Sequence, residues 1–314
     1  MKLNISIAIA CVVLLPGVAH GDPLPGEFAI RSAGGNFVTA VGGGGRTSDA
    51  IHTDLKDSLK IGSWEKFKLH VAPGHHRIYA IQTTTQHFVT AVGGGGRTTE
   101  PFFQTDRIHV QAWEQFNIFK QWTWSYIRVS NGDYVKLANG LRTGKSDDAG
   151  TAFLFYKCGE PGPDSFYHIS WATGGDPPRA PYDWLQAYGG GGRVSGAMGL
   201  HLLTTPNLQG TTFRLIRQAD GKYALQTQNG INFVTAVAGG GQSVAPTLQT
   251  NRTQVLAWEK FRLWIMPDCG YAFQTDSGHW LGLIDGRLTT RSQNITGVNK
   301  FRLHPANFGP RPGS

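Results

Sequence analysis

A verbatim repeat of eleven residues constrains the fold of this chain more than any other feature. Residues 37–47 have the sequence FVTAVGGGGRT, and residues 88–98 repeat it 51 positions later. Weaker copies follow at 184–194 (WLQAYGGGGRV) and 233–243 (FVTAVAGGGQS). Self-similarity at this spacing means that one supersecondary unit is used several times. A residue found in every copy is therefore expected to serve the shared scaffold before it serves any single binding site.

A phenylalanine closes each repeat, and in three copies it belongs to the motif WExF. It occurs at Phe67, Phe116, Phe153, Phe213, Phe261 and Phe301. The intervals between these positions are 49, 37, 60, 48 and 40 residues, so the third and sixth repeats are short. Both short repeats also lack the glycine-rich turn. The order long, long, short occurs twice, which predicts two domains of three repeats each.

Each repeat is predicted to consist of four short strands. Apolar residues alternate over four to six positions between turn residues, the period of half-buried strands. Three such units that close on themselves form a β-trefoil without exposed sheet edges. We therefore predict an all-β chain of two tandem β-trefoils, at 22–158 and 159–307, followed by a Pro/Gly tail at 308–314. A six-bladed propeller is the alternative, but the Gly-His…Trp-Asp signature is missing.

The first 21 residues have the layout of a secretory signal peptide. Lys2 precedes an apolar run over 3–15, and small residues lead to a predicted cleavage site near Gly21. A membrane anchor is the alternative, although this run is too short to span a bilayer. We expect a secreted, extracellular protein without a membrane span.

Cys158 and Cys269 remain in the predicted mature chain, at similar places in their repeats. Export permits a disulfide between them. Two free buried thiols are equally compatible with the sequence, and the spacing matches no metal motif.

The formal net charge is +8, and the basic residues are scattered along the chain. A mildly basic surface favours acidic partners such as an anionic polysaccharide or an acidic filament. Nucleic acid is not expected because no recognised binding motif is present. No cofactor motif is present either, so we expect no cofactor.

Together these motifs resemble the fascin-like β-trefoil repeat, over nearly the whole predicted mature chain. The shared pattern is a strand ending in Gln-Thr, an aromatic–apolar pair, a glycine turn, an Asp/Asn-Arg pair and the closing WExF. The pairs Asp106-Arg107 and Asn251-Arg252 match it, whereas the first repeat departs through an insertion at 55–62.

The resemblance implies more about fold than about function. The fascin-like family includes intracellular actin-bundling proteins, while its exported relatives look like carbohydrate-binding modules. Our leading hypothesis is a secreted, non-catalytic, lectin-like protein that binds a polysaccharide or glycoconjugate through repeated shallow sites. The alternatives are a crosslinker of actin or another acidic polymer, and a structural surface protein without a small ligand.

Arginines follow three of the glycine turns, at Arg46, Arg97 and Arg193. Converging backbone N–H groups and these arginines could form a shallow anion- or sugar-binding loop. The alternative is a wide hairpin loop that uses glycine only for its positive φ angles. A nucleotide-binding P-loop is excluded, because the motif lacks the lysine and the helix.

The Asp/Asn-Arg pairs are the polar candidates for ligand binding. A guanidinium held by Asp106 or Asn251 can donate to sugar hydroxyls or to an anion. The alternative is a pair that stabilises a turn. Asn251 and Asn294 also lie in glycosylation sequons, and a glycan at Asn251 would block that loop.

The repeated tryptophans of WExF, Trp64, Trp113 and Trp258, are predicted to pack in the core. The candidates for an exposed platform are aromatic residues that break the repeat, Trp122, Trp124 and Trp171, together with Trp184 and Tyr188, which flank the glycine turn whose strand is unusually aromatic. The recurring Glu65, Glu114 and Glu259 are expected to pair with an arginine such as Arg107 or Arg252.

No pattern of catalytic residues is found. A glycosidase needs two carboxylates that face each other, and one glutamate per repeat does not supply them. Neither a metal-binding HExxH nor a GxSxG motif is present. We expect no enzymatic activity.

Overall fold

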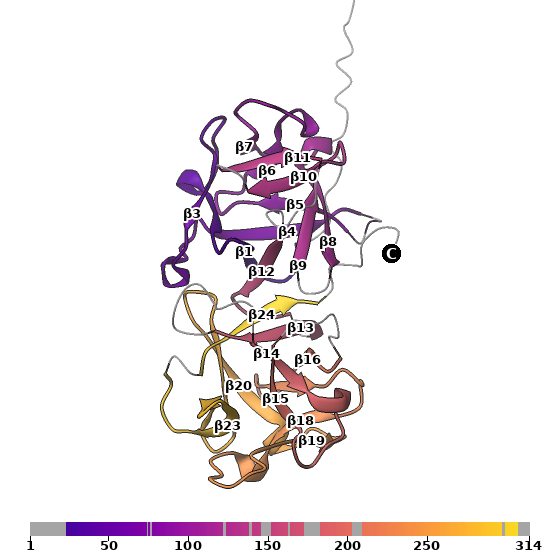
Figure 1. Cartoon of the computed structure of the whole chain (residues 1–314), viewed down its shortest axis with the longest axis vertical. Helices are drawn as coiled ribbons and strands as arrows, with labels where there is room; N and C mark the ends of the chain where they lie inside the picture. Colours follow the sequence, from indigo (N-terminus) through magenta and orange to yellow (C-terminus); the bar gives the residue numbers. More distant parts are fainter. Residues whose placement is uncertain are drawn as a thin grey trace, which may run out of the picture.

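A computed structural model gives the fold and describes residues 23–73, 75, 77–121, 124–137, 140–145, 152–162, 164–172, 183–202, 209–296 and 299–306. These residues form 24 strands in two sheets of twelve strands each. Six repeats of four strands result, and the predicted all-β fold of two tandem β-trefoils is confirmed. The two domains lie end to end along the long axis of the molecule (Figure 1). Within the described ranges, no helix is long and apolar enough to cross a membrane.

The strands of the first trefoil are β1 (Glu27–Ser32), β2 (Phe37–Ala40), β3 (Ile51–Leu55), β4 (Lys66–Val71), β5 (Ile78–Gln82), β6 (Phe88–Ala91), β7 (Phe103–Arg107), β8 (Gln115–Gln121), β9 (Trp124–Arg128), β10 (Tyr134–Leu137), β11 (Leu141–Gly144) and β12 (Phe153–Cys158). Its 3-10 helices are η1 (Val41–Gly43), η2 (Ser58–Lys60), η3 (Val92–Gly94) and η4 (Ala112–Glu114).

The strands of the second trefoil are β13 (Asp164–Trp171), β14 (Asp183–Ala187), β15 (Met198–Leu202), β16 (Thr212–Arg217), β17 (Tyr223–Gln226), β18 (Phe233–Ala236), β19 (Leu248–Arg252), β20 (Lys260–Ile265), β21 (Tyr271–Gln274), β22 (Trp280–Ile284), β23 (Arg287–Ser292) and β24 (Phe301–Pro305). Its 3-10 helices are η6 (Tyr188–Gly190), η7 (Val237–Gly239) and η8 (Ala257–Glu259).

The first and last strands of each repeat build a closed barrel. In the first trefoil, β1, β4, β5, β8, β9 and β12 pair in a ring, with β12 returning to β1. In the second, β13, β16, β17, β20, β21 and β24 close in the same way. The two inner strands of every repeat form a hairpin outside this ring. Barrel closure leaves these ring strands without a free edge.

The closing phenylalanines fill the two barrels. All six are at most 1% exposed. Alternation along each strand turns the residue two positions further on, such as Leu69 or Leu263, toward the same interior. Burial of a phenylalanine side chain contributes about 1.5–3 kcal/mol, so the repeated F-x-L pattern specifies both cores.

The glycine turns join neighbouring repeats through their backbone. The N–H group of Gly45 donates to the carbonyl oxygen of Thr105 at 2.6 Å. The N–H group of Thr105 donates to the carbonyl oxygen of Arg46 at 2.8 Å. Gly192, Arg193 and Thr250 repeat this arrangement in the second trefoil. These amide groups are therefore occupied, which argues against an anion-cradling loop. All four glycines at 42–45 have positive φ angles, as in the predicted wide hairpin loop.

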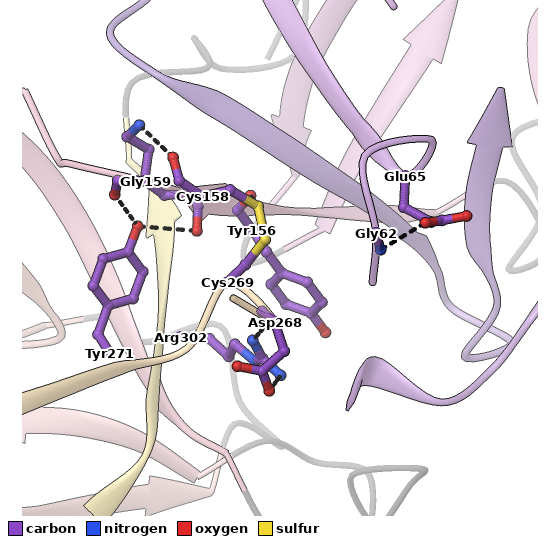
Figure 2. The surroundings of a disulfide bond; sticks show 10 residues. Gly62, Glu65, Tyr156, Cys158, Gly159, Asp268, Cys269, Tyr271 and Arg302 are labelled. Carbon is purple, nitrogen blue, oxygen red and sulfur yellow. Dashed lines mark hydrogen bonds and ion pairs between the residues drawn. A yellow bond between two sulfur atoms is a disulfide. The ribbon is translucent and has the colours of Figure 1, made fainter. Parts of the chain in front are cut away.

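The junction between the trefoils is covalently closed. Cys158, at the end of β12, forms a disulfide with Cys269 in the turn before β21, and both residues are buried (Figure 2). Nearby, the rings of Tyr156 and His304 pack edge to face, with centroids 5.0 Å apart. Strands β12 and β24, which carry these rings, lie side by side at the centre of Figure 1.

Candidate functional site

The tryptophans of the WExF motif are half exposed. Trp64, Trp113 and Trp258 expose 49%, 45% and 43% of their surface. The prediction that they pack in the core is wrong, because they do not lie in strands. Trp113 and Trp258 lie in the 3-10 helices η4 and η8, and Trp64 lies in the corresponding turn before β4. A turn of this kind carries the chain into the barrel only at the following phenylalanine.

The glutamate after each tryptophan fixes this turn. A carboxylate oxygen accepts a hydrogen bond from the backbone N–H group three residues upstream, at 2.8–2.9 Å. The three pairs are Glu65 with Gly62, Glu114 with Gln111, and Glu259 with Leu256. This is half of a capping box, and all three carboxylates are buried. The expected pairing of these glutamates with an arginine is therefore wrong.

The glycine turn supports the indole from the other side. Helix η3 packs on η4, and η7 packs on η8. A Cβ atom added at Gly94 would lie 3.3 Å from Cδ1 of Trp113, and one at Gly239 would lie 3.5 Å from Cδ1 of Trp258. The repeated glycines thus bring the turn close to the indole. The tryptophan is held in place while about half of it stays in solvent.

A groove of about 450 Å³ lies beside Trp258. Its lining runs from Arg252 through Leu256 to Glu259 and includes the indole. The guanidinium of Arg252 is exposed and makes no hydrogen bond or ion pair with any described residue. In the second repeat, Arg107 precedes Trp113 by the same six residues and is likewise exposed and free of partners. The first repeat has Leu55 at the position of this arginine.

Asp106 and Asn251 do not hold the arginines that follow them. Each lies near the end of a strand, β7 or β19, rather than in a turn. The side-chain oxygen Oδ1 of each is buried without a hydrogen-bond partner. Both interpretations of the Asp/Asn-Arg pairs, as a held guanidinium and as a turn lock, are therefore wrong. Of the two glycosylation sequons, the one at Asn294 is exposed, whereas Asn251 is half buried.

The arginines of the glycine turns fold back onto their own loops. Arg46 donates to the carbonyl oxygens of Ser48 and Asp49, Arg97 to that of Thr99, and Arg193 to that of Gly196. The distances are 3.1–3.4 Å. These arginines stabilise the loops and do not converge on the groove beside Trp258.

Trp184 does not belong to an exposed platform. It is buried, and its ring packs against His304 and His168 with centroids 4.7 and 5.9 Å apart. Tyr188 is half buried and covers Gly199, where an added Cβ would collide with its ring. Both predictions of exposure are therefore wrong. Trp124 and Trp171 are also partly buried, and Trp122 lies outside the described residues.

A second groove, of about 550 Å³, lies between the first and third repeats of the first trefoil. Its lining includes the polar side chains of Asn36, His52, Asp54 and Lys56. His52 pairs with Asp49 at 2.6 Å, and this bond holds the pKa of the Asp49 carboxyl below its ordinary value. Among the described residues no phenylalanine, tyrosine or tryptophan lines this groove, so they offer no stacking surface like that of Trp258.

Comparisons with known proteins show no family for this chain. No family model matches the sequence, and no curated protein is similar to it. The designed three-fold symmetric protein ThreeFoil is 14% identical, over 44% of this chain and 97% of its own, with a TM-score of 0.37. A Polyporus squamosus lectin bound to a human-type influenza-binding epitope is 12% identical, over 42% and 49%, with a TM-score of 0.34.

A glycosidase is also among the similar structures. The GlcNAcα1-4Gal-releasing endo-β-galactosidase from Clostridium perfringens is 10% identical, over 89% of this chain and 71% of its own, with a TM-score of 0.35. At such identities and TM-scores these likenesses support no statement about the function of this chain. The resemblance to fascin-like repeats stays a prediction.

Proposed function

We propose that this protein binds carbohydrate, without catalysis, at the tryptophan turns of its long repeats. One observation carries the proposal: the indole of Trp258 is half exposed in a groove that it shares with the unpaired guanidinium of Arg252. Half-exposed tryptophans also occupy the corresponding turns at Trp64 and Trp113, and the second of these turns has the free arginine Arg107.

The chemistry of the groove suits a sugar. The apolar C–H face of a pyranose ring can lie on an indole, which offers a large and rigid contact surface. The planar guanidinium of Arg252 can donate several hydrogen bonds to hydroxyl groups beside that ring. The indole is held before the ligand arrives, by the bond from Leu256 to Glu259 and by Gly239. Preorganisation of this kind reduces the entropy lost on binding.

The repeated turns favour a polymeric ligand. A shallow groove with one aromatic residue binds a single sugar weakly, but several linked sites raise the avidity toward a polymer. Two of the turns belong to the first trefoil and one to the second. We infer that the natural ligand is a polysaccharide or a densely glycosylated surface.

The geometry of the groove also argues against catalysis. The carboxylate of Glu259 lines the groove, but it is buried and engaged by a backbone N–H group. It therefore serves the turn and not a scissile bond.

Export of the protein is part of the proposal as well. A buried disulfide is typical of proteins from oxidising compartments, which supports export.

A glycan array with the full mature chain at physiological salt tests the proposal. We expect a soluble form of the bound glycan to compete, and replacement of Trp258 by alanine to weaken binding by about tenfold. Phe166→Ala is the matched control, because Phe166 is also an exposed aromatic residue of the second trefoil but lies in β13.

Co-pelleting with actin filaments from the same preparation separates the alternative. Filament binding through scattered basic residues should weaken steeply as salt rises, whereas sugar stacking should not. A blank array with salt-sensitive co-pelleting would replace the proposal by a filament crosslinker. A blank in both assays would leave a structural role.

A further inference from the structure

Trp264 is an exposed tryptophan that the proposed turn sites do not use. It lies near the end of strand β20, on the outside of the second barrel, and 45% of its surface is exposed. The same position occurs in every repeat, three residues after the closing phenylalanine. The other repeats have His70, Phe119, Tyr156, Ile216 and His304 there.

In the other repeats this position is partly or fully covered by neighbours. Phe119 is buried beneath Tyr126 and Tyr134, and Tyr156 and His304 bury one another at the domain junction. His70 is buried beside Phe88. Ile216 is half buried. Of the six side chains, only Trp264, the largest, remains exposed.

The indole is nevertheless held in a fixed orientation. Its Nε1–H group donates to Oε1 of Gln274 at 3.1 Å, and Gln274 in turn donates to the carbonyl oxygen of Gly278. The ring rests against Trp280, with centroids 5.7 Å apart. Ala272 stands directly opposite on β21 and has no side chain long enough to cover it. Three neighbouring strands therefore hold a rigid aromatic surface, as a preformed site requires.

A free cation accompanies this surface. Arg262 lies two residues before Trp264 on the same strand, so its side chain leaves the same face of the sheet about 7 Å away. It is exposed and makes no hydrogen bond or ion pair with any described residue. A comparable pair on β16 and β13 behaves differently, because Arg214 there is stacked on Phe166 and bound to Asp164 at 2.5 Å.

We propose that Trp264 and Arg262 form a separate binding site for an acidic polysaccharide. A sugar ring lies on the indole, and the carboxylate or sulfate group of that sugar or the next one pairs with the guanidinium. A planar guanidinium matches a carboxylate or sulfate through two parallel hydrogen bonds. The net charge of +8 draws the same class of polymer to the surface.

This site rests on the proposed function only in that its ligand is a glycan. The turn sites recur three times and follow the repeat. The Trp264 site occurs once, depends on the charge of the ligand, and lies on the barrel wall. The two can therefore fail separately.

Binding of the full mature chain to polygalacturonate, alginate and heparin tests the site, with fully methyl-esterified polygalacturonate as the uncharged counterpart. We expect Trp264→Ala to weaken binding to an acidic polymer by about tenfold, and Arg262→Gln by about threefold to tenfold. Arg262→Gln should leave binding to the esterified polymer unchanged. Phe166→Ala and Arg217→Gln are controls for the loss of an exposed ring and of one charge elsewhere.

Three outcomes would overturn this inference. The first is that the unmodified protein retains none of the acidic polymers. The second is that Trp264→Ala binds as tightly as the Phe166→Ala control. The third is that Arg262→Gln weakens binding to the charged and the esterified polymer equally. Trp258→Ala in the same assay separates the two proposals, because loss of binding in that variant alone would support the turn sites and reject Trp264.

Discussion

The hydroxyl group of Tyr271 in the second trefoil donates a hydrogen bond to the carbonyl oxygen of Gly159, 2.7 Å away, just beyond the last strand of the first trefoil (Figure 2). The same hydroxyl lies 3.1 Å from the carbonyl oxygen of Lys157. Between these two residues, Cys158 is bonded to Cys269. The chain that leaves the first trefoil is thus fastened to the second at three successive residues.

Removal of the disulfide should therefore destabilise the protein. The bond spans 111 residues, and closing a loop of that size stabilises the folded state by about 4.7 kcal/mol in the chain-entropy model, with measured values of about 2–4 kcal/mol. We expect the double variant Cys158→Ser, Cys269→Ser to unfold at a lower urea concentration. Equal midpoints for this variant and the oxidised protein would contradict the interpretation.

The glycine turns should tolerate alanine at their first position and not at their third. An added Cβ at Gly95 would lie 2.4 Å from Cγ2 of Val129, whereas Gly93 has open space, and the fifth repeat already has Ala238 there. We expect Gly93→Ala to cost about 1 kcal/mol for its positive φ angle. Gly95→Ala should cost about 2–3 kcal/mol or more, because strain and collision add. Thermal unfolding of the two variants would show whether this order holds.

Trp184 should contribute more to the stability of the protein than Trp258, although their sequence motifs suggest the reverse. Trp184→Ala empties a fully buried site and should cost about 3–5 kcal/mol. Trp258→Ala removes a half-exposed ring, so the free energy of unfolding should fall by about 1 kcal/mol or less. Chemical unfolding measures both effects. A larger loss of the free energy of unfolding for Trp258→Ala would show that this tryptophan packs in the core.

Stability should fall as the pH decreases from about 6.5, the ordinary pKa of histidine. Burial, together with the charge of Lys120, lowers the pKa of His168 to about 3, and the bond to Thr211 offsets only part of this effect. Burial and the same charge hold the pKa of His304 well below its ordinary value. Both histidines stay neutral in the folded protein, while in the unfolded chain they take up protons below pH 6.5. The contribution of these two histidines to stability should therefore be fully present above that pH and decline below it.

The slope should be about 1.4 kcal/mol per pH unit for each histidine between pH 6 and 4.5. Urea unfolding at a series of pH values measures it, and His168→Asn should remove about half of the slope. A stability that does not change over this range would show that the two imidazoles are already charged in the folded state.

Most of the fold could be predicted from the sequence, because periodicity and repeat length are global features. The closing phenylalanines mark six repeats, and the two short repeats mark the end of each barrel. The glycine turns also behave as predicted, since few residues other than glycine adopt four successive positive φ angles.

Exposure at single positions could not be predicted in the same way. The expectation that the repeated tryptophan packs in the core fails at Trp258, because a 3-10 turn precedes the strand and follows no strand alternation. The available signal for this turn was Glu259, three residues after Leu256, since the two residues of a capping box have this spacing. Trp184 is buried like Phe37, Phe88 and Phe233, which occupy the same position in their repeats, so the register of the repeat was the signal for its burial.

The partners of the charged residues could not be predicted for a related reason. Hydrogen bonds to local backbone groups compete with pairing between side chains. Glu259 binds the N–H group of Leu256, and Arg46 binds carbonyl oxygens of its own loop. Arg252 remains free, and neither its spacing from Trp258 nor its pairing with Asn251 in the sequence showed this.

The most direct test of the proposed function is a calorimetric titration of the mature protein with a soluble glycan selected on the array. The comparison is with the triple variant Trp64→Ala, Trp113→Ala, Trp258→Ala, once circular dichroism has shown that the variant is folded. We predict that the protein binds the glycan at about three sites and that the triple variant loses these sites. Equal heat and equal stoichiometry for the two proteins would contradict a carbohydrate site at the tryptophan turns.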